Sequence, residues 1–188
     1  IALTNSLNAT MGARYDKISN ADNKATIQIG LVQKLTENTN LRANYAQGYR
    51  APDIAELYVV SPSYKDGKRF GSDVIFGPKT SAYELKPEQS QTFEIALSNR
   101  MDKLFSEIVL FNTKIDDKIE LVSYGSGNAK YYTSENLDKV DIKGVELNLD
   151  YTLNDNADLN FNLTYLDTED KSTNKELIFT PDLSASLG

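Results

Sequence analysis

Residues 145–165 read VELNLDYTLNDNADLNFNLTY, and this stretch shows how the rest of the chain is built. Every second residue from Val145 is apolar, and the same alternation returns from Leu159. A period of two residues is typical of a β-strand with one apolar face. The intervening NDNAD favours a tight turn, because Asn and Asp side chains bond the local backbone. The stretch therefore predicts a β-hairpin.

The same alternation extends outward from this hairpin in both directions. The segment from Leu104 to Lys114 carries apolar residues on both faces, so the pattern does not orient it. Counted this way, the chain has about eight strands, which begin near Leu7, Ile27, Leu41, Thr92, Leu104, Val145, Leu159 and Leu183.

The connections between these strands alternate in length. Short turns are expected at 36–40, 99–103 and 154–158. Long loops are expected at 16–24, 49–90, 116–139 and 167–181. Neighbouring antiparallel strands then place every long loop on one side, as in outer-membrane barrels, whose long loops lie outside the cell. Segments of about ten residues also fit the 9–11 that cross a bilayer as a tilted strand. The expected fold is an all-β, antiparallel, up-and-down transmembrane β-barrel, with residues 1–188 as one partial barrel domain.

A soluble β-sandwich that serves as a binding module is the alternative, because its strands are also amphipathic. The alternating loop lengths favour the barrel. The direction of the apolar face separates the two folds, since it points to lipid in a barrel and to a dry core in a sandwich.

Composition excludes several classes of function. The chain has no Cys and no His, which excludes thiol nucleophiles, Ser-His-Asp triads and Cys/His zinc sites. Its 27 acidic residues outnumber its 20 basic ones, so no basic surface indicates nucleic acid. The carboxylates at Asp116, Asp117, Asp167, Glu169 and Asp170 lack EF-hand spacing, and we interpret them as solvated rather than as a metal site. No catalytic arrangement is recognisable, and we expect a protein that is not an enzyme.

The longest loop has a composition unlike the strands around it. It opens with GYRAPDIAELY at 48–58, closes with ELKPEQS at 84–90, and contains four of the five prolines. It shows no steady period. Loops of this length are usually functional or disordered, and we predict a binding loop held by a rigid sheet.

Both ends of this loop resemble sequence elements of one family, the TonB-dependent outer-membrane receptors. Tyr49-Arg50-Ala51-Pro52 resembles the family's Tyr/Phe-Arg-Ala-Pro element. Leu85-Lys86-Pro87-Glu88 resembles the end of its Asn-Pro-x-Leu-Lys-Pro-Glu element. Weaker matches follow at 111–119, 143–146 and 180–181. Ser81-Ala82-Tyr83-Glu84 departs from the family pattern, which has Gly-Asn-Pro at that place. Family barrels have 22 strands, so the resemblance implies about a third of a barrel, without the plug.

The resemblance also implies a function and a location. Family members capture a scarce nutrient, usually a ferric siderophore, and import it across the outer membrane of a Gram-negative bacterium. The partners implied are outer-membrane lipid, TonB through the plug, the iron chelate, and colicin or phage. Cobalamin is an alternative ligand, whereas the histidine that haem receptors carry in this loop is absent. No resident cofactor is expected, and the exposed edges of a fragment predict self-association.

Candidate ligand-binding residues follow from the charge of such a chelate. Ferric siderophores are often anionic, and cations with aromatic faces suit them. Arg50 and Glu88 are expected to anchor the two ends of the loop rather than to touch the ligand. The candidates in the long loop and in the next one are Tyr58, Tyr64, Lys65, Lys68, Arg69, Tyr83, Lys130, Tyr131 and Tyr132.

Overall fold

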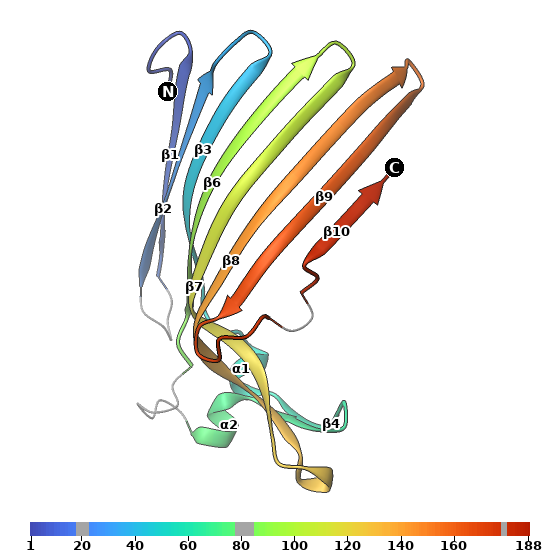
Figure 1. Ribbon diagram of the computed structural model, residues 1–188. Helices are drawn as coiled ribbons and strands as arrows, with labels where there is room; N and C mark the ends of the chain where they lie inside the picture. The colour runs from blue at the N-terminus through green and yellow to red at the C-terminus, as the bar shows by residue number, and fades with distance from the viewer. Residues whose placement is uncertain (18–22, 78–84, 178–179) are drawn as a thin grey trace.

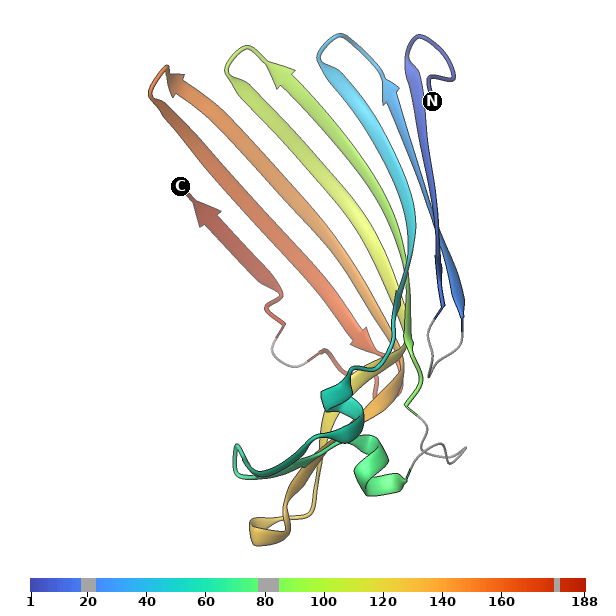
Figure 2. The same ribbon diagram turned by 180° about the vertical axis from the view of Figure 1, so that it is seen from behind.

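The computed structural model describes residues 1–17, 23–77, 85–177 and 180–188, except for the side chains of 137 and 138. These residues form one curved, single-layered sheet with a small folded segment at one end (Figure 1). The view from behind shows the same single layer (Figure 2). No helix in these ranges is long and apolar enough to cross a membrane.

The strands and helices have the following bounds. The strands of the main sheet are β1 (Leu7–Asp16), β2 (Lys24–Lys34), β3 (Thr39–Arg50), β6 (Glu88–Met101), β7 (Leu104–Tyr124), β8 (Tyr131–Asn154), β9 (Ala157–Asp170) and β10 (Leu183–Leu187). The short elements are α1 (Ile54–Tyr58), β4 (Val60–Tyr64), β5 (Gly67–Phe70), α2 (Ser72–Phe76) and the 3₁₀ turn η1 (Gly127–Ala129).

The eight strands of the main sheet form an antiparallel meander, β1-β2-β3-β6-β7-β8-β9-β10. Each pairs with its neighbours in sequence, which confirms the predicted up-and-down order. Turns of two residues join β6 to β7 and β8 to β9 at one end of the sheet. The long connections lie at the other end, as the alternating loop lengths predict (Figure 1).

The register places apolar residues from neighbouring strands side by side on one face. Ile95 of β6 lies between Ala43 of β3 and Leu110 of β7, and Leu97 lies opposite Ile108 in the next row. These side chains are not covered: Leu110 is 51% exposed and Ile108 is 44% exposed. A sandwich would bury them under a second sheet, but all ten strands assigned in the described ranges belong to one sheet. The exposed Ile108 and Leu110 also orient β7, which the sequence pattern left open.

The opposite face is polar and more crowded. Arg42 pairs with Glu94 at 3.4 Å and with Glu107 at 3.0 Å, each on a different strand. The small residues between them are nearly covered, with Ala96 1% and Val109 4% exposed. Side chains converge on the concave side of a curved sheet, so this burial indicates the inner face.

Two of the predicted loops are more ordered than the sequence pattern suggests. Most of 116–139 is strand, because β7 runs to Tyr124 and β8 begins at Tyr131. The alternation is weak there because charged and polar residues outnumber apolar ones such as Ile119 and Leu121, although the pairing register is the same before and after Asp117. The stretch 49–90 also contains α1, β4, β5 and α2, each only four or five residues long and too short to show a period.

The other two predicted loops are shorter than expected at their described ends. β1 includes Asp16 and β2 includes Lys24, so strand residues occupy both limits of the predicted loop at 16–24. β9 runs to Asp170, which then pairs with Lys175 across a turn. Residues 18–22 and 178–179 lie outside the described ranges.

Candidate functional site

Residues 51–77 fold into a compact segment on the long-loop side of the sheet. Its first helix, α1, begins with a capping box, in which Asp53 accepts the Glu56 N–H at 2.7 Å and Glu56 accepts the Asp53 N–H at 2.8 Å. Gly71 lets the chain return past this helix, because a Cβ there would lie 2.2 Å from the Leu57 carbonyl. The helices α1 and α2 therefore pack together, with the β4–β5 hairpin projecting beyond them (Figure 2).

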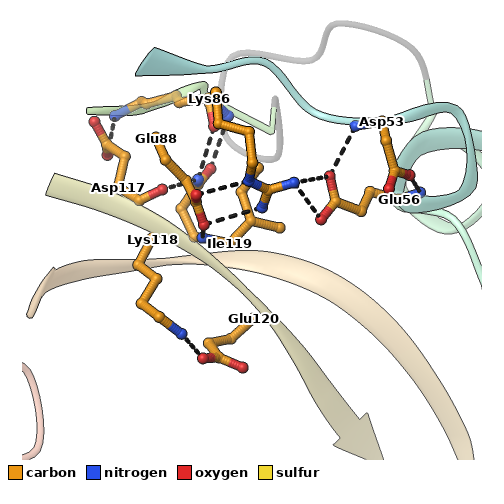
Figure 3. Close-up of polar contacts among 10 residues, drawn as sticks. Asp53, Glu56, Lys86, Glu88, Asp117, Lys118, Ile119 and Glu120 are labelled. Carbon is orange, nitrogen blue, oxygen red and sulfur yellow. Dashed lines mark hydrogen bonds and ion pairs between the residues drawn. The ribbon is translucent and has the colours of Figure 1, made fainter. Parts of the chain in front are cut away.

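A charged network fixes this segment where it leaves the sheet. The Arg50 guanidinium donates to both oxygens of Glu88, through Nε at 2.7 Å and Nη2 at 3.0 Å, and through Nη1 to Glu56 at 2.9 Å. Glu88 also accepts the Ile119 N–H at 2.7 Å (Figure 3). We call Arg50, Glu56, Glu88 and Ile119 the root network. The root network joins β3, β6, α1 and the extension of β7. The planar guanidinium of Arg50 can bind both Glu88 oxygens because its N–H donors point in fixed, parallel directions.

A second link joins the closing end of the segment to β7 and β8. The Asn136 side chain accepts the Lys86 N–H at 2.7 Å and donates to the Lys86 carbonyl at 2.9 Å. It also donates to the Asp117 carbonyl at 2.6 Å, while the Lys86 ammonium lies 3.7 Å from the Asp117 carboxylate (Figure 3). Leu85, beside this link, is only 6% exposed. Both ends of the long connection are thus held against the β7–β8 hairpin.

Farther out, aromatic and charged side chains from two separate connections meet. The strand β5 runs parallel to the start of β8, with Lys68 beside Tyr131 and Arg69 beside Tyr132. The Tyr64 and Tyr132 rings pack edge to face, with centroids 5.4 Å apart. We call the residues gathered here the tip cluster: Tyr64, Lys65, Asp66, Arg69, Lys130 and Tyr132.

Three cations of the tip cluster lie over its two rings. The Lys65 ammonium is 5.5 Å from the Tyr64 centroid and 5.6 Å from that of Tyr132. Arg69 lies 5.4 Å from the Tyr64 centroid, and Lys130 lies 5.2 Å from that of Tyr132. These distances are within the range of cation–π attraction, about 6 Å. The cluster presents positive charge on aromatic faces.

Asp66 is the acidic member of the tip cluster. Its carboxylate lies 2.7 Å from the Lys130 ammonium and accepts a hydrogen bond from the Tyr132 hydroxyl. The Lys130 bond, followed by that of Tyr132, lowers the pKa of Asp66 to about 2, and the same contact raises the pKa of Lys130. Since the lowered pKa keeps the Asp66 carboxylate charged, the pair persists below the pH at which an ordinary Asp becomes protonated and is lost only as pH falls through about 2.

Five of the nine predicted ligand residues fall in the tip cluster: Tyr64, Lys65, Arg69, Lys130 and Tyr132. Lys68 adjoins the cluster, and its backbone N–H donates to the Lys130 carbonyl at 3.1 Å. Tyr131 faces the other side of β8, where its ring stacks on Tyr124 at 5.5 Å and contacts Phe70 at 6.3 Å. Tyr58 ends α1 beside Gly71, away from the tip, and Tyr83 lies outside the described residues.

Sequence reasoning missed Asp66, because only cations and aromatic residues were considered there. The available signal was the dipeptide Asp66-Gly67, which is frequent at hairpin turns; the turn itself is Lys65-Asp66, and Gly67 begins β5. The acidic residues considered for calcium instead have basic or hydroxyl partners: Asp116 lies 3.6 Å from Lys139, and Asp170 accepts from Ser172 and Thr173. In the described ranges, no group of three or more His, Cys, Asp or Glu could hold a metal ion.

Comparison with known proteins places this architecture in one family. The chain is 31% identical over 182 residues to the ferric enterobactin receptor of Pseudomonas aeruginosa, covering 89% of this chain and 23% of the receptor. It is 30% identical over 129 residues to the hemoglobin and hemoglobin-haptoglobin-binding protein of Haemophilus ducreyi, covering 61% of this chain and 12% of that protein.

Its structure resembles that of the ferric enterobactin receptor PfeA, crystallised with BCV-L6. The TM-score is 0.75 at 25% identity, and the match covers 99% of this chain and 28% of that chain. The chain thus spans about a quarter of the length of these receptors. Residues 1–188 match the family described as "TonB dependent receptor-like, beta-barrel". The exposed apolar rows are therefore the lipid-facing side of an outer-membrane barrel, and the chain belongs to the TonB-dependent receptor family of Gram-negative bacteria.

Proposed function

We propose that this chain is the part of an outer-membrane receptor that captures a ferric siderophore outside the cell, for import that depends on TonB. The tip cluster is the observation that carries the proposal. It lies on the long-loop side and joins cations to aromatic faces, the combination that attracts an anionic aromatic chelate. The receptor then acts in binding and transport, not as an enzyme.

The local charge supports an anionic ligand. Residues 60–70 and 130–132 contain Lys65, Lys68, Arg69 and Lys130 against Asp66 alone, which gives +4 − 1 = +3. The whole chain carries −7, so the remaining residues carry −10. A cationic patch on an acidic protein concentrates anions locally and speeds their association.

Ferric enterobactin is the ligand to test first, because two of the similar proteins are receptors for it by name. A protein that binds hemoglobin is also similar, but the present chain has no histidine to ligate haem iron. Cobalamin lacks the high negative charge that this tip would attract.

The test is calorimetric titration of the complete receptor with ferric enterobactin. We expect Tyr132→Ala and Arg69→Ala each to weaken binding about tenfold, because each removes an aromatic or cationic contact worth about 1–2 kcal/mol. Tyr58→Ala is the matched control, since it removes an exposed tyrosine of the same segment outside the tip, and it should change affinity less than twofold. Equal affinities for all four proteins would contradict the proposal.

A further inference from the structure

Asp66 occupies an unusual place in a site whose other charged members are cations. It lies in the turn between β4 and β5, next to Lys65, which has a positive φ of 48°. Each of its carboxylate oxygens has its own donor: Lys130 binds Oδ2 at 2.7 Å, and the Tyr132 hydroxyl donates to Oδ1. The Asp66 side chain is nevertheless 65% exposed, whereas that of Lys130 is 24% exposed.

The donors that hold Asp66 are those that an anionic ligand would need. The Lys130 ammonium over the Tyr132 ring, together with the hydroxyl of that ring, suits a negatively charged oxygen pair. Lys130 and Tyr132 already give these bonds to a carboxylate of the chain itself. An anionic chelate that binds at the tip must therefore compete with Asp66.

The fold of the tip does not depend on this carboxylate. The β4–β5 hairpin has its own pairing, with Tyr64 opposite Gly67 and Val60 opposite Phe70. The Lys68 N–H donates to the Lys130 carbonyl at 3.1 Å, which joins the hairpin to β8 through the backbone. The exposed Asp66 side chain can rotate away from its donors while the backbone contacts remain.

We propose that Asp66 is an internal stand-in for the ligand's anionic oxygens and that it sets the charge selectivity of the tip. A highly charged chelate displaces the carboxylate from Lys130 and Tyr132, whereas a neutral chelate gains too little from these donors to do so. Asp66 also restrains Lys130 in the empty receptor, which limits binding of unrelated small anions. This inference rests on the proposed capture of a ferric siderophore.

Asp66→Asn in the complete receptor tests it, because Asn keeps the shape of the side chain and removes its charge. Calorimetric titration with ferric enterobactin, a trianionic tris-catecholate, is compared with titration by a charge-neutral ferric tris-hydroxamate. We expect the variant to bind ferric enterobactin roughly three- to tenfold more tightly, with a steeper dependence on salt, since a competing charge is gone. Affinity for the neutral chelate should change less than twofold.

Asp53→Asn is the matched control. It removes one negative charge from the same segment, and Asn caps a helix about as well as Asp. This control should leave the affinity for both chelates within twofold of the unmodified receptor. An equal gain in Asp53→Asn would show a general charge effect and would overturn the inference.

The outcomes separate this inference from the proposed function. If Arg69→Ala weakens binding of ferric enterobactin while Asp66→Asn leaves it unchanged or weakens it, Asp66 is not a stand-in and the inference alone is wrong. If the unmodified receptor does not bind ferric enterobactin, or Arg69→Ala has no effect, the proposed capture and the inference are both wrong.

Discussion

Ile108→Arg is expected to destabilise the membrane-inserted barrel by about 2–4 kcal/mol, the range measured for Arg or Lys at the lipid-facing midplane of such barrels. Ile108 lies in an apolar row of the outer face, between Leu97 of β6 and Leu147 of β8, and is 44% exposed. The guanidinium would have to reach the lipid headgroups or remain unsolvated. Urea unfolding of the receptor in lipid vesicles measures the loss.

The matched control places the same charge on the other face of the sheet. Asn148 lies opposite Glu107 on the polar face, where an added Arg meets a carboxylate and water. Asn148→Arg should therefore change the free energy of unfolding by less than about 1 kcal/mol, because the added charge stays beside a carboxylate on the polar face and away from lipid. An effect as large as that of Ile108→Arg would mean that the two faces have been assigned to the wrong sides.

Arg50→Lys is expected to loosen the folded segment where it leaves the sheet. Lysine keeps the positive charge but cannot pair with Glu88 through two donors and with Glu56 through a third. Hydrogen bonds to charged groups contribute about 1.5–3 kcal/mol, and the 44% exposure of the Arg50 side chain reduces this value. A loss of about 1.4 kcal/mol makes α1 amides exchange roughly tenfold faster.

Hydrogen exchange of the α1 amides in the complete receptor measures this change. The control is Arg100→Lys, because Arg100 lies over the Phe105 ring at the short-turn end of the sheet, 4.9 Å from its centroid. That substitution should leave exchange in α1 unaltered. Unchanged exchange in Arg50→Lys would show that the root network does not hold the segment.

The main sheet could be predicted because its physical signal is regular. In Val145–Leu153 and Leu159–Tyr165, every second residue is apolar, and one lipid-facing side demands this pattern over the whole width of the membrane. Loop lengths supplied the second clue, since short turns and long connections alternate. Together they predicted the strand order that the structure confirms.

The alternation fails where the sheet leaves the membrane. Beyond Asp116, elements of 51–77 lie against part of β8, and the buried residues of the β7–β8 extension are a mixture of polar Thr133 and Ser134 with apolar Ile119, so the regular lipid-facing alternation is not required. The short elements of 51–77 carried local signals instead, namely the Asp53 and Glu56 capping box and the Asp66-Gly67 dipeptide at the β4–β5 turn. Reading these signals would have predicted a helix and a hairpin inside the long connection.

The candidate site was predictable in its chemistry but not in its geometry. Counting cations and aromatic residues selected Tyr64 and Arg69 in one connection, and Lys130 and Tyr132 in another. That these two groups meet depends on the parallel pairing of β5 with β8, a tertiary contact with no local sequence signal. Asp66 was missed because its role depends on that same contact.

Labelling on intact cells tests most directly whether the tip cluster lies outside the cell and binds the chelate. The chain has no cysteine, so Ser63→Cys, at an exposed position beside the tip cluster, gives a single reactive site for a membrane-impermeant maleimide. Asp155→Cys, in the short turn between β8 and β9, is the control for the opposite side of the membrane. We expect Ser63→Cys to react on intact cells, ferric enterobactin to slow that reaction, and Asp155→Cys to react only after lysis. Labelling of Asp155→Cys but not of Ser63→Cys on intact cells, or a Ser63→Cys rate that ferric enterobactin leaves unchanged, would contradict the account.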